Sequence, residues 1–389
     1  MIAMEIKPQT WGGMMVQRTL RVLVVDDSKL IQTLISDLLE ETPDIEVIAT
    51  AADGHEAVRL ARSLKPDVIT LDVQMPKMDG LETLDAILAE QLIPVIMVSA
   101  TTQLGGQITL EALDRGAIDY IAKPEGLKEA ETTLRTELVR RIRMVSNTDV
   151  QKVLTMRRER AQKRKERREK LGLSNDSKII PKPILTEKLP VSDKCIALGI
   201  STGGPPALAA MFEILPDTLP PIVIVQHMPA NFTEAFAGRL NSLSRVRVKE
   251  AETGDVLQPG HAYLAPGGKH LEVVRSGTQG GKLLVRDGDF VSGHRPSVDV
   301  MMSSAVKVYK DRLLGVIMTG MGRDGSDGCG EIRAAGGYVL GQDEATSDVY
   351  GMNKVAFLEG NVDRQFSLDE AAATVTAQVR RLWGTATVS

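Results

Sequence analysis

A serine lies in a short string that is typical of nucleophilic serines. The residues Gly199-Ile200-Ser201-Thr202-Gly203 fit the pattern G-x-S-x-G, in which a sharp strand-to-helix turn exposes a serine hydroxyl. An apolar run over residues 195–200 ends at this string, and a helical pattern over residues 205–215 follows it. The spacing therefore predicts a strand, a turn and a helix, with Ser201 at the turn. A serine nucleophile also requires a base, an acid that orients the base, and donors for the oxyanion.

Two further residues complete a candidate triad. His227 directly follows the strand expected over residues 222–226, and Asp324 lies in the turn after the strand expected over residues 313–318. Because the carboxyl ends of parallel strands meet at one edge of a sheet, we expect Ser201, His227 and Asp324 to lie together. In that arrangement His227 takes the proton of Ser201, and Asp324 orients the imidazole.

Glycine-rich turns flank the same residues and offer donors for an oxyanion. Without a Cβ, the glycines of residues 203–204 and 320–325 let the backbone approach a reacting carbon closely. We expect the amides near Thr202 and Met321 to bind the oxyanion. The expected reaction is an acyl-serine route that uses no cofactor and no metal in the catalytic site.

Each of these residues also has an ordinary structural interpretation when it is taken alone. Serine is favoured as a helix N-cap, a histidine can simply be buried and hydrogen-bonded, and aspartate is common in Asx turns. Three other histidines compete as the base: His261, His270 and His294. His294, within SGHRPSVD, is the strongest rival, and we interpret it as a substrate-side or structural residue. The residue order of an α/β-hydrolase, in which a histidine follows near the end of the chain, is not found, because no histidine lies beyond His294. A phosphate-binding P-loop is not expected either, because no lysine follows the glycines.

A second set of polar residues lies at strand ends in the first part of the chain. The strands expected over residues 21–25, 67–71 and 94–99, and the string DYIA, lead to Asp26, Asp27, Asp72, Ser99 and Lys123. Three carboxylates at one edge of a sheet repel one another unless a hard cation joins them, and Mg²⁺ suits such oxygen ligands. With Mg²⁺ bound, Asp72 is a candidate nucleophile toward a phosphoryl group, and Lys123 neutralises phosphate oxygens. Taken singly, such acids are usually solvated or cap helices, but their joint placement favours a phosphorylation site.

The elements that position both sets alternate between strand and helix. Strict alternation implies parallel sheets that are covered by helices on both faces. We expect an α/β protein with two doubly wound parallel-sheet domains, the second carrying a β-rich insert over residues 246–290. The expected boundaries are an N-terminal extension over 1–19, expected to be disordered, a first domain over 20–145, a charged linker over 146–193 and a second domain over 194–385.

The linker contains a strongly basic run. RRERAQKRKERREK, residues 157–170, contains nine Lys or Arg and three Glu, and no large apolar side chain. The residues after it, 174–194, are polar and contain three prolines. We favour a solvated tether, partly helical at first and extended later, over an arm that binds acidic protein, a membrane surface or nucleic acid. No helix-turn-helix or RNA-binding motif accompanies the run, so specific nucleic-acid binding is not expected.

Composition bounds the remaining function classes. The 389 residues, of which 43% are hydrophobic, 25% charged and 3% aromatic, predict a soluble globular protein with two or three domains. The net charge of -4 gives no general attraction to a polyanion. Cys195 and Cys329 are the only cysteines, which favours the reduced thiols of a cytoplasm. No apolar run approaches the roughly 20 residues of a membrane span, and the first 20 residues lack the apolar core of a secretory signal.

Three strings of the first domain resemble the receiver domains of bacterial response regulators. They are VVDDS (24–28), LDVQMPKMDG (71–80) and YIAKP (120–124). The resemblance implies a flavodoxin-like fold in which Asp72 accepts a phosphoryl group from a histidine kinase. It implies Mg²⁺ bound by Asp27, Asp72 and the backbone carbonyl of Gln74, with Asp26 acting largely through water. The switch residues it implies are Ser99 and Tyr120, with Lys123 at the phosphate.

Several strings of the second domain resemble the chemotaxis protein-glutamate methylesterase family, the CheB type. They are GISTGGP (199–205), QHMP (226–229), YLAPGG (263–268), HRPSVDV (294–300), TGMGRDG (319–325) and VYGM (349–352). The resemblance spans residues 195–383 and places Ser201, His227 and Asp324 on the family's triad, and the amide of Met321 on its oxyanion position. Asn353 stands where a proline is expected, and the first 20 residues have no counterpart.

The second resemblance implies a function and its partners. It implies hydrolysis of glutamate methyl esters on methyl-accepting chemotaxis receptors, with release of methanol, and deamidation of receptor glutamines. A receiver that covers the active site until it is phosphorylated, and a chemotaxis histidine kinase as phosphodonor, are implied as well. The expected location is the cytoplasm at receptor arrays, with contact to membranes only through receptors.

Two alternatives belong to other classes of protein. One is a signalling adaptor whose hydrolase-like domain only binds a partner, which a serine-directed probe that fails to label the protein would support. The other is a nucleic-acid-binding regulator that works through the basic run, for which steeply salt-dependent DNA affinity would be the sign.

Overall fold

The first domain is built on a five-stranded parallel sheet. The computed structural model describes residues 18–100, 102–123, 130–170, 192–277 and 280–384. The strands are β1 (Leu20–Val25), β2 (Ile45–Ala51), β3 (Val68–Asp72), β4 (Val95–Ser99) and β5 (Asp119–Ala122), in the order β2-β1-β3-β4-β5. This is the flavodoxin-like order, so the expected fold of the receiver is confirmed. The extension expected to be disordered lies outside the described residues, except for residues 18 and 19.

Five helices surround this sheet. They are α1 (Lys29–Glu40), α2 (Gly54–Leu64), α3 (Gly80–Glu90), α4 (Gln103–Arg115) and α5 (Ala130–Val145). Aspartates start two of them: Asp53 accepts a hydrogen bond of 2.9 Å from the amide of Glu56, and Asp79 forms a capping box with Glu82. These caps fix where α2 and α3 begin, beside the edge of the sheet that carries the carboxylates.

The second domain contains a seven-stranded parallel sheet in the order β14-β13-β12-β6-β7-β9-β8. Its strands are β6 (Cys195–Ile200), β7 (Ile222–Gln226), β8 (Arg247–Glu250), β9 (His261–Leu264), β12 (Leu313–Ile317), β13 (Tyr338–Gln342) and β14 (Arg364–Phe366). A separate antiparallel hairpin pairs β10 (His270–Arg275) with β11 (Gly281–Arg286). The β-rich insert expected over residues 246–290 is therefore partly wrong, because β8 and β9 belong to the main sheet.

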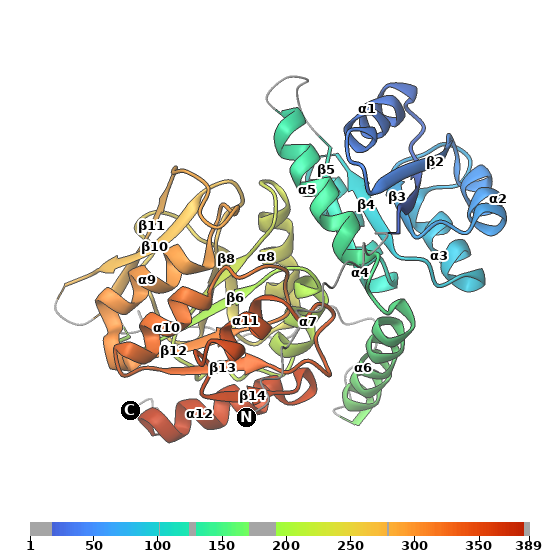
Figure 1. Cartoon of the computed structure of the whole chain (residues 1–389). Helices are drawn as coiled ribbons and strands as arrows, with labels where there is room; N and C mark the ends of the chain where they lie inside the picture. The colour runs from blue at the N-terminus through green and yellow to red at the C-terminus, as the bar shows by residue number, and fades with distance from the viewer. Residues whose placement is uncertain (1–17, 101, 124–129, 171–191, 278–279, 385–389) are drawn as a thin grey trace, which may run out of the picture.

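Helices cover both faces of this sheet (Figure 1). They are α7 (Gly204–Phe212), α8 (Phe232–Leu243), α9 (Val298–Tyr309), α10 (Ser326–Ala334), α11 (Met352–Leu358) and α12 (Ala371–Trp383). The alternation along β6 shows how the faces divide. Ile196, Leu198 and Ile200 belong to the core that includes α7, α8 and α12, whereas Cys195 and Ala197 belong to the core that includes α9, α10 and α11.

The basic linker forms a docked helix, α6 (Val150–Lys170), that runs beside the second domain (Figure 1). Its first turns bury Val150, Val153 and Leu154 in the receiver core. The expected helical start of the linker is confirmed, but the solvated tether expected for residues 157–170 is wrong at Arg157, whose buried side chain pairs with Asp348 of the second domain. The second half, expected to be extended, lies outside the described residues.

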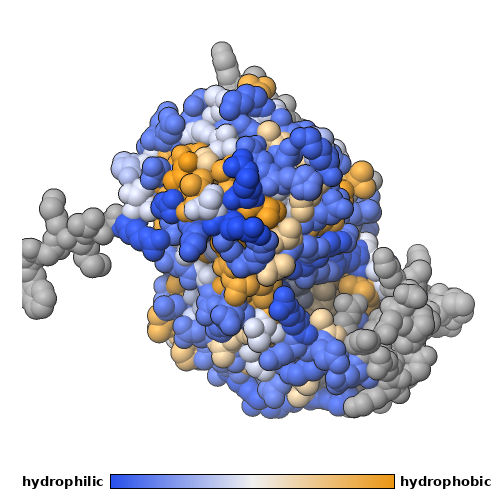
Figure 2. Space-filling model, turned by 90° about the vertical axis from the view of Figure 1, so that its right-hand side faces the viewer, coloured by the Kyte–Doolittle hydropathy of each residue, from blue (hydrophilic) through white to orange (hydrophobic). Residues whose placement is uncertain are grey.

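The surface on the side of the receiver and α6 is mainly hydrophilic, with apolar residues in smaller groups (Figure 2). Exposed large apolar side chains of the receiver include Leu30, Leu92 and Leu104. Among the helices of the described residues, none is both long and apolar enough to cross a membrane.

Candidate active site and its contacts with the receiver

Ser201 lies at the turn between β6 and α7, as the sequence predicts. Its amide donates a hydrogen bond of 2.9 Å to the carbonyl of Thr319, which follows β12. The N-cap of α7 is Gly203 at a φ of 77°, so the helix begins at Gly204, three residues after the serine. The interpretation of Ser201 as a helix N-cap is therefore wrong, and its hydroxyl makes no hydrogen bond within the described part of the chain.

His227 and Asp324 form a buried pair. His227 follows β7, Asp324 follows β12, and His227 Nε2 lies 2.8 Å from Asp324 Oδ2. Because β12, β6 and β7 are neighbours in the sheet, the two residues approach from either side of the strand that ends at Ser201. The interpretation of Asp324 as only an Asx-turn residue does not account for this pairing.

The carboxylate of Asp324 also caps α9. It accepts hydrogen bonds from the hydroxyl of Ser297 at 2.8 Å and from the amides of Val298 at 2.7 Å and Asp299 at 3.1 Å. Burial alone raises the pKa of Asp324, but the hydrogen bond and charge of His227 and the α9 amides outweigh it and hold the pKa below its ordinary value. Asp324 is thus ionised at neutral pH and suited to stabilise an imidazolium.

The edge of His227 that remains for Ser201 is Nδ1. Asp324 occupies Nε2, and Nδ1 is buried with no hydrogen-bond partner within the described residues. The structure brings Ser201 and His227 to adjacent strand ends but shows no hydrogen bond between the hydroxyl and the ring. Hydrogen bonds between catalytic groups are often long before substrate binds. The role of His227 as base stays a prediction, now with Nδ1 as the reacting atom.

The turn after β12 packs directly on Ser201. A Cβ at Gly320 would lie 2.7 Å from Cβ of Ser201, so only glycine allows this approach. Met321 follows, and its amide donates no hydrogen bond within the described residues. The hydroxyl of Thr319 donates to the carbonyl of Thr202 at 2.9 Å, which links this turn to the one at Ser201. Both turns expected to supply oxyanion donors therefore lie beside the serine.

The rival base, His294, is stacked on His227. The ring centroids lie 3.6 Å apart with an interplanar angle of 5°. Arg140 of α5 lies 3.0 Å from Nε2 of His294. Burial lowers the pKa of His294, and the charges of His227 and Arg140 lower it further. The other two rivals bond elsewhere: Nδ1 of His261 to the carbonyl of Pro259, and Nε2 of His270 to the carbonyl of Asp289.

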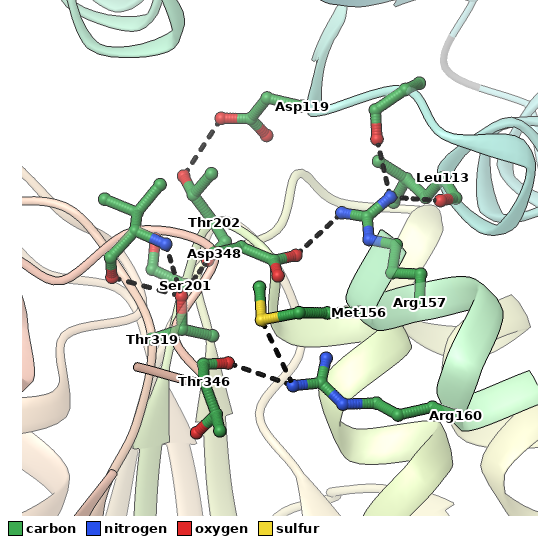
Figure 3. Close-up of polar contacts among 12 residues, drawn as sticks. Leu113, Asp119, Met156, Arg157, Arg160, Ser201, Thr202, Thr319, Thr346 and Asp348 are labelled. Carbon is green, nitrogen blue, oxygen red and sulfur yellow. Dashed lines mark hydrogen bonds and ion pairs between the residues drawn. The ribbon is translucent and has the colours of Figure 1, made fainter. Parts of the chain in front are cut away.

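Receiver side chains contact the active-site edge at further points. The hydroxyl of Thr202, next to Ser201, donates a hydrogen bond of 3.0 Å to the carboxylate of Asp119 at the start of β5 (Figure 3). Tyr120 of β5 stacks on Phe232 at the start of α8, with ring centroids 5.4 Å apart. Arg239 of α8 forms an ion pair with Asp114 of α4. The α4-β5-α5 side of the receiver therefore lies against the active-site edge of the second domain.

Arg157 of helix α6 contacts both the receiver and the second domain (Figure 3). The guanidinium donates to the carbonyls of Leu113 at 2.5 Å and Ala117 at 3.0 Å in the receiver, and to Asp348 of the second domain at 2.7 Å. A Cβ at Gly203 would lie 2.6 Å from Cβ of Asp348, so this aspartate adjoins the turn at Ser201. The pair is well buried, with 8% and 5% of the two side chains exposed.

Two more basic residues of α6 reach the second domain. Arg160 donates to Asp369 at 3.1 Å and to the carbonyl of Thr346 at 3.2 Å, and Lys163 lies 2.6 Å from Asp369. With Arg157, these residues recur every three positions, on one side of the helix. Part of the basic run thus serves contacts within the protein.

The phosphorylation site predicted in the receiver is also brought together. Ligand atoms of Asp26, Asp27 and Asp72 all lie within 4.8 Å of one another. Lys123 Nζ lies 2.8 Å from both Asp26 and Asp72. Burial raises the pKa of Asp72, and Asp26 acts in the same direction, while Lys123 opposes them. Hard oxygen ligands at this spacing fit Mg²⁺, which would offset the repulsion between the carboxylates.

The remaining receiver residues lie around that edge. Gln74 follows β3 by two residues with an exposed side chain, and its carbonyl stays a predicted Mg²⁺ ligand. Ser99 is fully buried at the end of β4. Tyr120 is buried with a hydroxyl that lacks a hydrogen-bond partner in the described ranges. Its ring contacts α8 at Phe232, and its role as a switch stays a prediction.

Comparisons with known proteins agree with both resemblances. The family model "CheB methylesterase" matches residues 196–375, and "Response regulator receiver domain" matches residues 22–135. A protein-glutamate methylesterase/protein-glutamine glutaminase 1 of Caulobacter vibrioides is 43% identical over 357 residues, covering 92% of this chain and 97% of the relative. A protein-glutamate methylesterase/protein-glutamine glutaminase of Pectobacterium atrosepticum is 41% identical over 362 residues, covering 92% and 97%. The chain belongs to the CheB methylesterase family.

The enzyme class of this family is protein-glutamate methylesterase, a carboxylic ester hydrolase. Among solved structures, the catalytic domain of Thermotoga maritima CheB methylesterase is 38% identical, covers 48% of this chain and 100% of that chain, and has a TM-score of 0.47. The family membership confirms the expectations of a hydrolase, a response regulator and a two-component system.

Several residues around the candidate site were not found from the sequence. Asp119, Arg140 and Phe232 act across the domain contact, which no local pattern reveals. Ser297 had a signal, since a serine before a helical pattern is a common N-cap, and its hydroxyl does accept from the amide of Val300 at 3.3 Å. That it also bonds Asp324 could not be read from spacing.

The departure from the family pattern at Asn353 has a structural use. Asn353 is fully buried in α11, and its amide donates to the carbonyl of Gln342 and to the hydroxyl of Ser347, both at 2.8 Å. These bonds tie α11 to the end of β13. The substitution therefore leaves the candidate triad untouched.

Proposed function

We propose that this chain hydrolyses glutamate methyl esters on methyl-accepting chemotaxis receptors, releasing methanol, and deamidates receptor glutamines. The observation that carries the proposal is the buried His227–Asp324 pair, 2.8 Å between Nε2 and Oδ2, at the strand ends that flank Ser201. Ester and amide carbonyls are both substrates for a serine activated in this way.

The residues at the site define the steps of the reaction. Nδ1 of His227 accepts the proton of Ser201 as the oxygen attacks the glutamyl carbonyl carbon, and the ionised Asp324 stabilises the imidazolium. The imidazolium then gives its proton to the leaving methoxide or amide nitrogen, so that methanol or ammonia departs. Water attacks the glutamyl-serine ester with His227 again as base, which releases the glutamate side chain and restores Ser201.

The oxyanion of each tetrahedral intermediate requires donors near Ser201. The amide of Met321, on the turn that packs against Ser201, and the amide of Thr202 are the proposed donors. The route needs no metal in this site.

The receiver supplies control. A chemotaxis histidine kinase transfers a phosphoryl group to Asp72. Asp26, Asp27, Asp72 and the carbonyl of Gln74 would hold Mg²⁺ there. When bound, the metal neutralises charge on the transferred group. In the unphosphorylated protein Asp119 and Arg140 contact Thr202 and His294 beside Ser201. Phosphorylation releases these contacts as Ser99 and Tyr120 move, and this release activates the enzyme. Activation takes place at receptor arrays in the cytoplasm.

The proposal is tested by methanol release from methylated receptor membranes. Wild type is compared with Ser201→Ala, each with and without Mg²⁺ and a small-molecule phosphodonor. We expect release that needs Ser201, with a loss on the order of 10⁴-fold or more in the variant, and that rises with the phosphodonor. Equal release by both proteins would exclude the serine mechanism, and no release by wild type from its cognate receptors would favour the adaptor.

Arg157 offers a separate test of the regulatory part. Arg157→Gln removes a guanidinium that bonds the receiver and Asp348 together. We expect methanol release without phosphodonor to rise several-fold toward the activated rate, because a buried ion pair that loses one partner weakens the docked state. The matched control is Arg158→Gln, since Arg158 is the exposed neighbour on the same helix. An unchanged basal rate in a folded Arg157→Gln protein would show that α6 does not hold the receiver closed.

A further inference from the structure

His294 is placed where it acts on the candidate base rather than competing with it. The two imidazole rings are almost parallel, 5° apart, at a centroid separation of 3.6 Å. Neither ring nitrogen of His227 is left for His294. Nε2 lies beside Asp324, and Nδ1 accepts the proton of Ser201 in the proposed mechanism. What His294 contributes to His227 is therefore the flat face of its ring.

The backbone at His294 forms a tight turn. Val291 and His294 form an isolated antiparallel bridge, closed by Ser292 at a φ of 52° and Gly293 at a φ of 77°. The amide of His294 donates to the carbonyl of Val291 at 2.9 Å. His294 is buried. Burial of the side chain and its contact with Arg140 leave the ring little freedom to rotate away from His227.

Only a neutral His294 is compatible with the proposed chemistry. His227 becomes an imidazolium in each half of the reaction, and two imidazolium rings at this separation would repel strongly. A guanidinium can only donate hydrogen bonds, so the contact with Arg140 makes Nε2 of His294 an acceptor and leaves its proton on Nδ1. The charged groups that act on His294 are His227, Arg140 and Arg141, which disfavour its cation, and Asp324, which favours it.

We propose that His294 is a positioning residue for the general base, and that its neutral ring, stacked on His227, holds Nδ1 of His227 toward Ser201. The proposal rests on the proposed function, because it assigns a role in the same reaction. It also gives the receiver a path to the base, since Arg140 of α5 reaches His227 through His294.

Two variants separate the ring from its hydrogen bond. His294→Phe keeps a flat ring that can stack but cannot accept from Arg140, and His294→Gln keeps an acceptor but loses the aromatic face. Methanol release is measured on the full chain with Mg²⁺ and phosphodonor, so that the receiver is released in every sample. Thermal unfolding of each variant is followed in parallel.

The two variants are expected to diverge. For His294→Gln we expect kcat to fall about 10- to 100-fold with KM nearly unchanged, because small displacements of a catalytic group cost this much. For His294→Phe we expect kcat within a few-fold of wild type, so that a ring without the hydrogen bond rescues the rate.

Other outcomes would overturn the proposal. A slow Phe variant beside an active Gln variant would make the hydrogen bond, not the stack, the important contact. Wild-type rates in both variants, or equal losses in both, would also exclude it. A raised KM with unchanged kcat would make His294 a substrate contact instead. Release by wild type in the same assay distinguishes each of these results from failure of the proposed function.

Discussion

Replacement of Asp324 by Asn is expected to lower kcat for methanol release by about 10⁴-fold while the protein stays folded. The carboxylate holds His227 at 2.8 Å and carries the negative charge that a protonated imidazole needs beside it. An amide keeps the shape but removes the charge, and its NH₂ group can force the wrong tautomer of His227. The measurement is steady-state methanol release by the phosphodonor-treated enzyme.

Asp327→Asn is the matched control for this variant. Asp327 lies three residues further on, its side chain is 59% exposed, and its partner is Arg323 on the surface. We expect its kcat to equal that of wild type within about twofold, because exposed ion pairs contribute little. Comparable losses in both variants would mean that the turn, rather than the charge of Asp324, determines the rate.

The same residue predicts how stability depends on pH. Since Asp324 has a lowered pKa in the folded protein, its ionised form stabilises the fold above its ordinary pKa, and this contribution is lost as the pH falls through the lowered value. The difference in free energy of unfolding between wild type and Asp324→Asn should therefore be present at neutral pH and shrink in acid. Urea unfolding at neutral pH and at about pH 3 measures it. A difference that does not change with pH would contradict the lowered pKa.

Replacement of Asp72 by Asn is expected to abolish stimulation by the phosphodonor. Asp72 is the candidate phosphoacceptor, only 2% exposed, beside Asp26, Asp27 and Lys123. An amide neither accepts the phosphoryl group nor completes the carboxylate set for Mg²⁺, so basal methanol release should remain and the phosphodonor response should vanish. Methanol release with and without phosphodonor, together with Mg²⁺ titration, tests both effects.

Asp37→Asn, on the exposed side of α1, is the control and should keep the full response.

Burial raises the pKa of Asp72 in the folded protein, so the fold loses stability as the pH rises through this raised pKa and the carboxyl group ionises. Without Mg²⁺, Asp72→Asn should therefore unfold at higher urea than wild type at neutral pH. Persistent stimulation of the variant would place phosphorylation elsewhere.

Residues at strand ends were the part of the site that the sequence could predict. Ser201, His227 and Asp324, like Asp26 and Asp72, follow apolar runs, and parallel strands bring such positions to one edge. Which apolar segments pair with each other is a different question. The short strands β8 and β9 looked like parts of an insert because their pattern does not reveal that they extend the main sheet beyond β7.

Contacts between distant segments were beyond prediction for a physical reason. Arg157 lies in a run whose composition is typical of solvated helices, yet its partner Asp348 is 191 residues away. The stack of His294 on His227 likewise depends on the fold of a turn that belongs to neither strand end. Burial of a charge or a ring by a remote partner is a tertiary property that local patterns do not encode.

The hydrogen bond between Thr202 and Asp119 has a thermodynamic consequence. Under the proposed function, the docked receiver contacts the residue next to Ser201 and competes with a receptor glutamate for one surface. If docking weakens substrate binding by some factor, then bound substrate must weaken docking by the same factor. A high local density of methylated receptor would thus open the unphosphorylated protein by mass action, and the receptor would lower the amount of phosphorylation needed for its own demethylation.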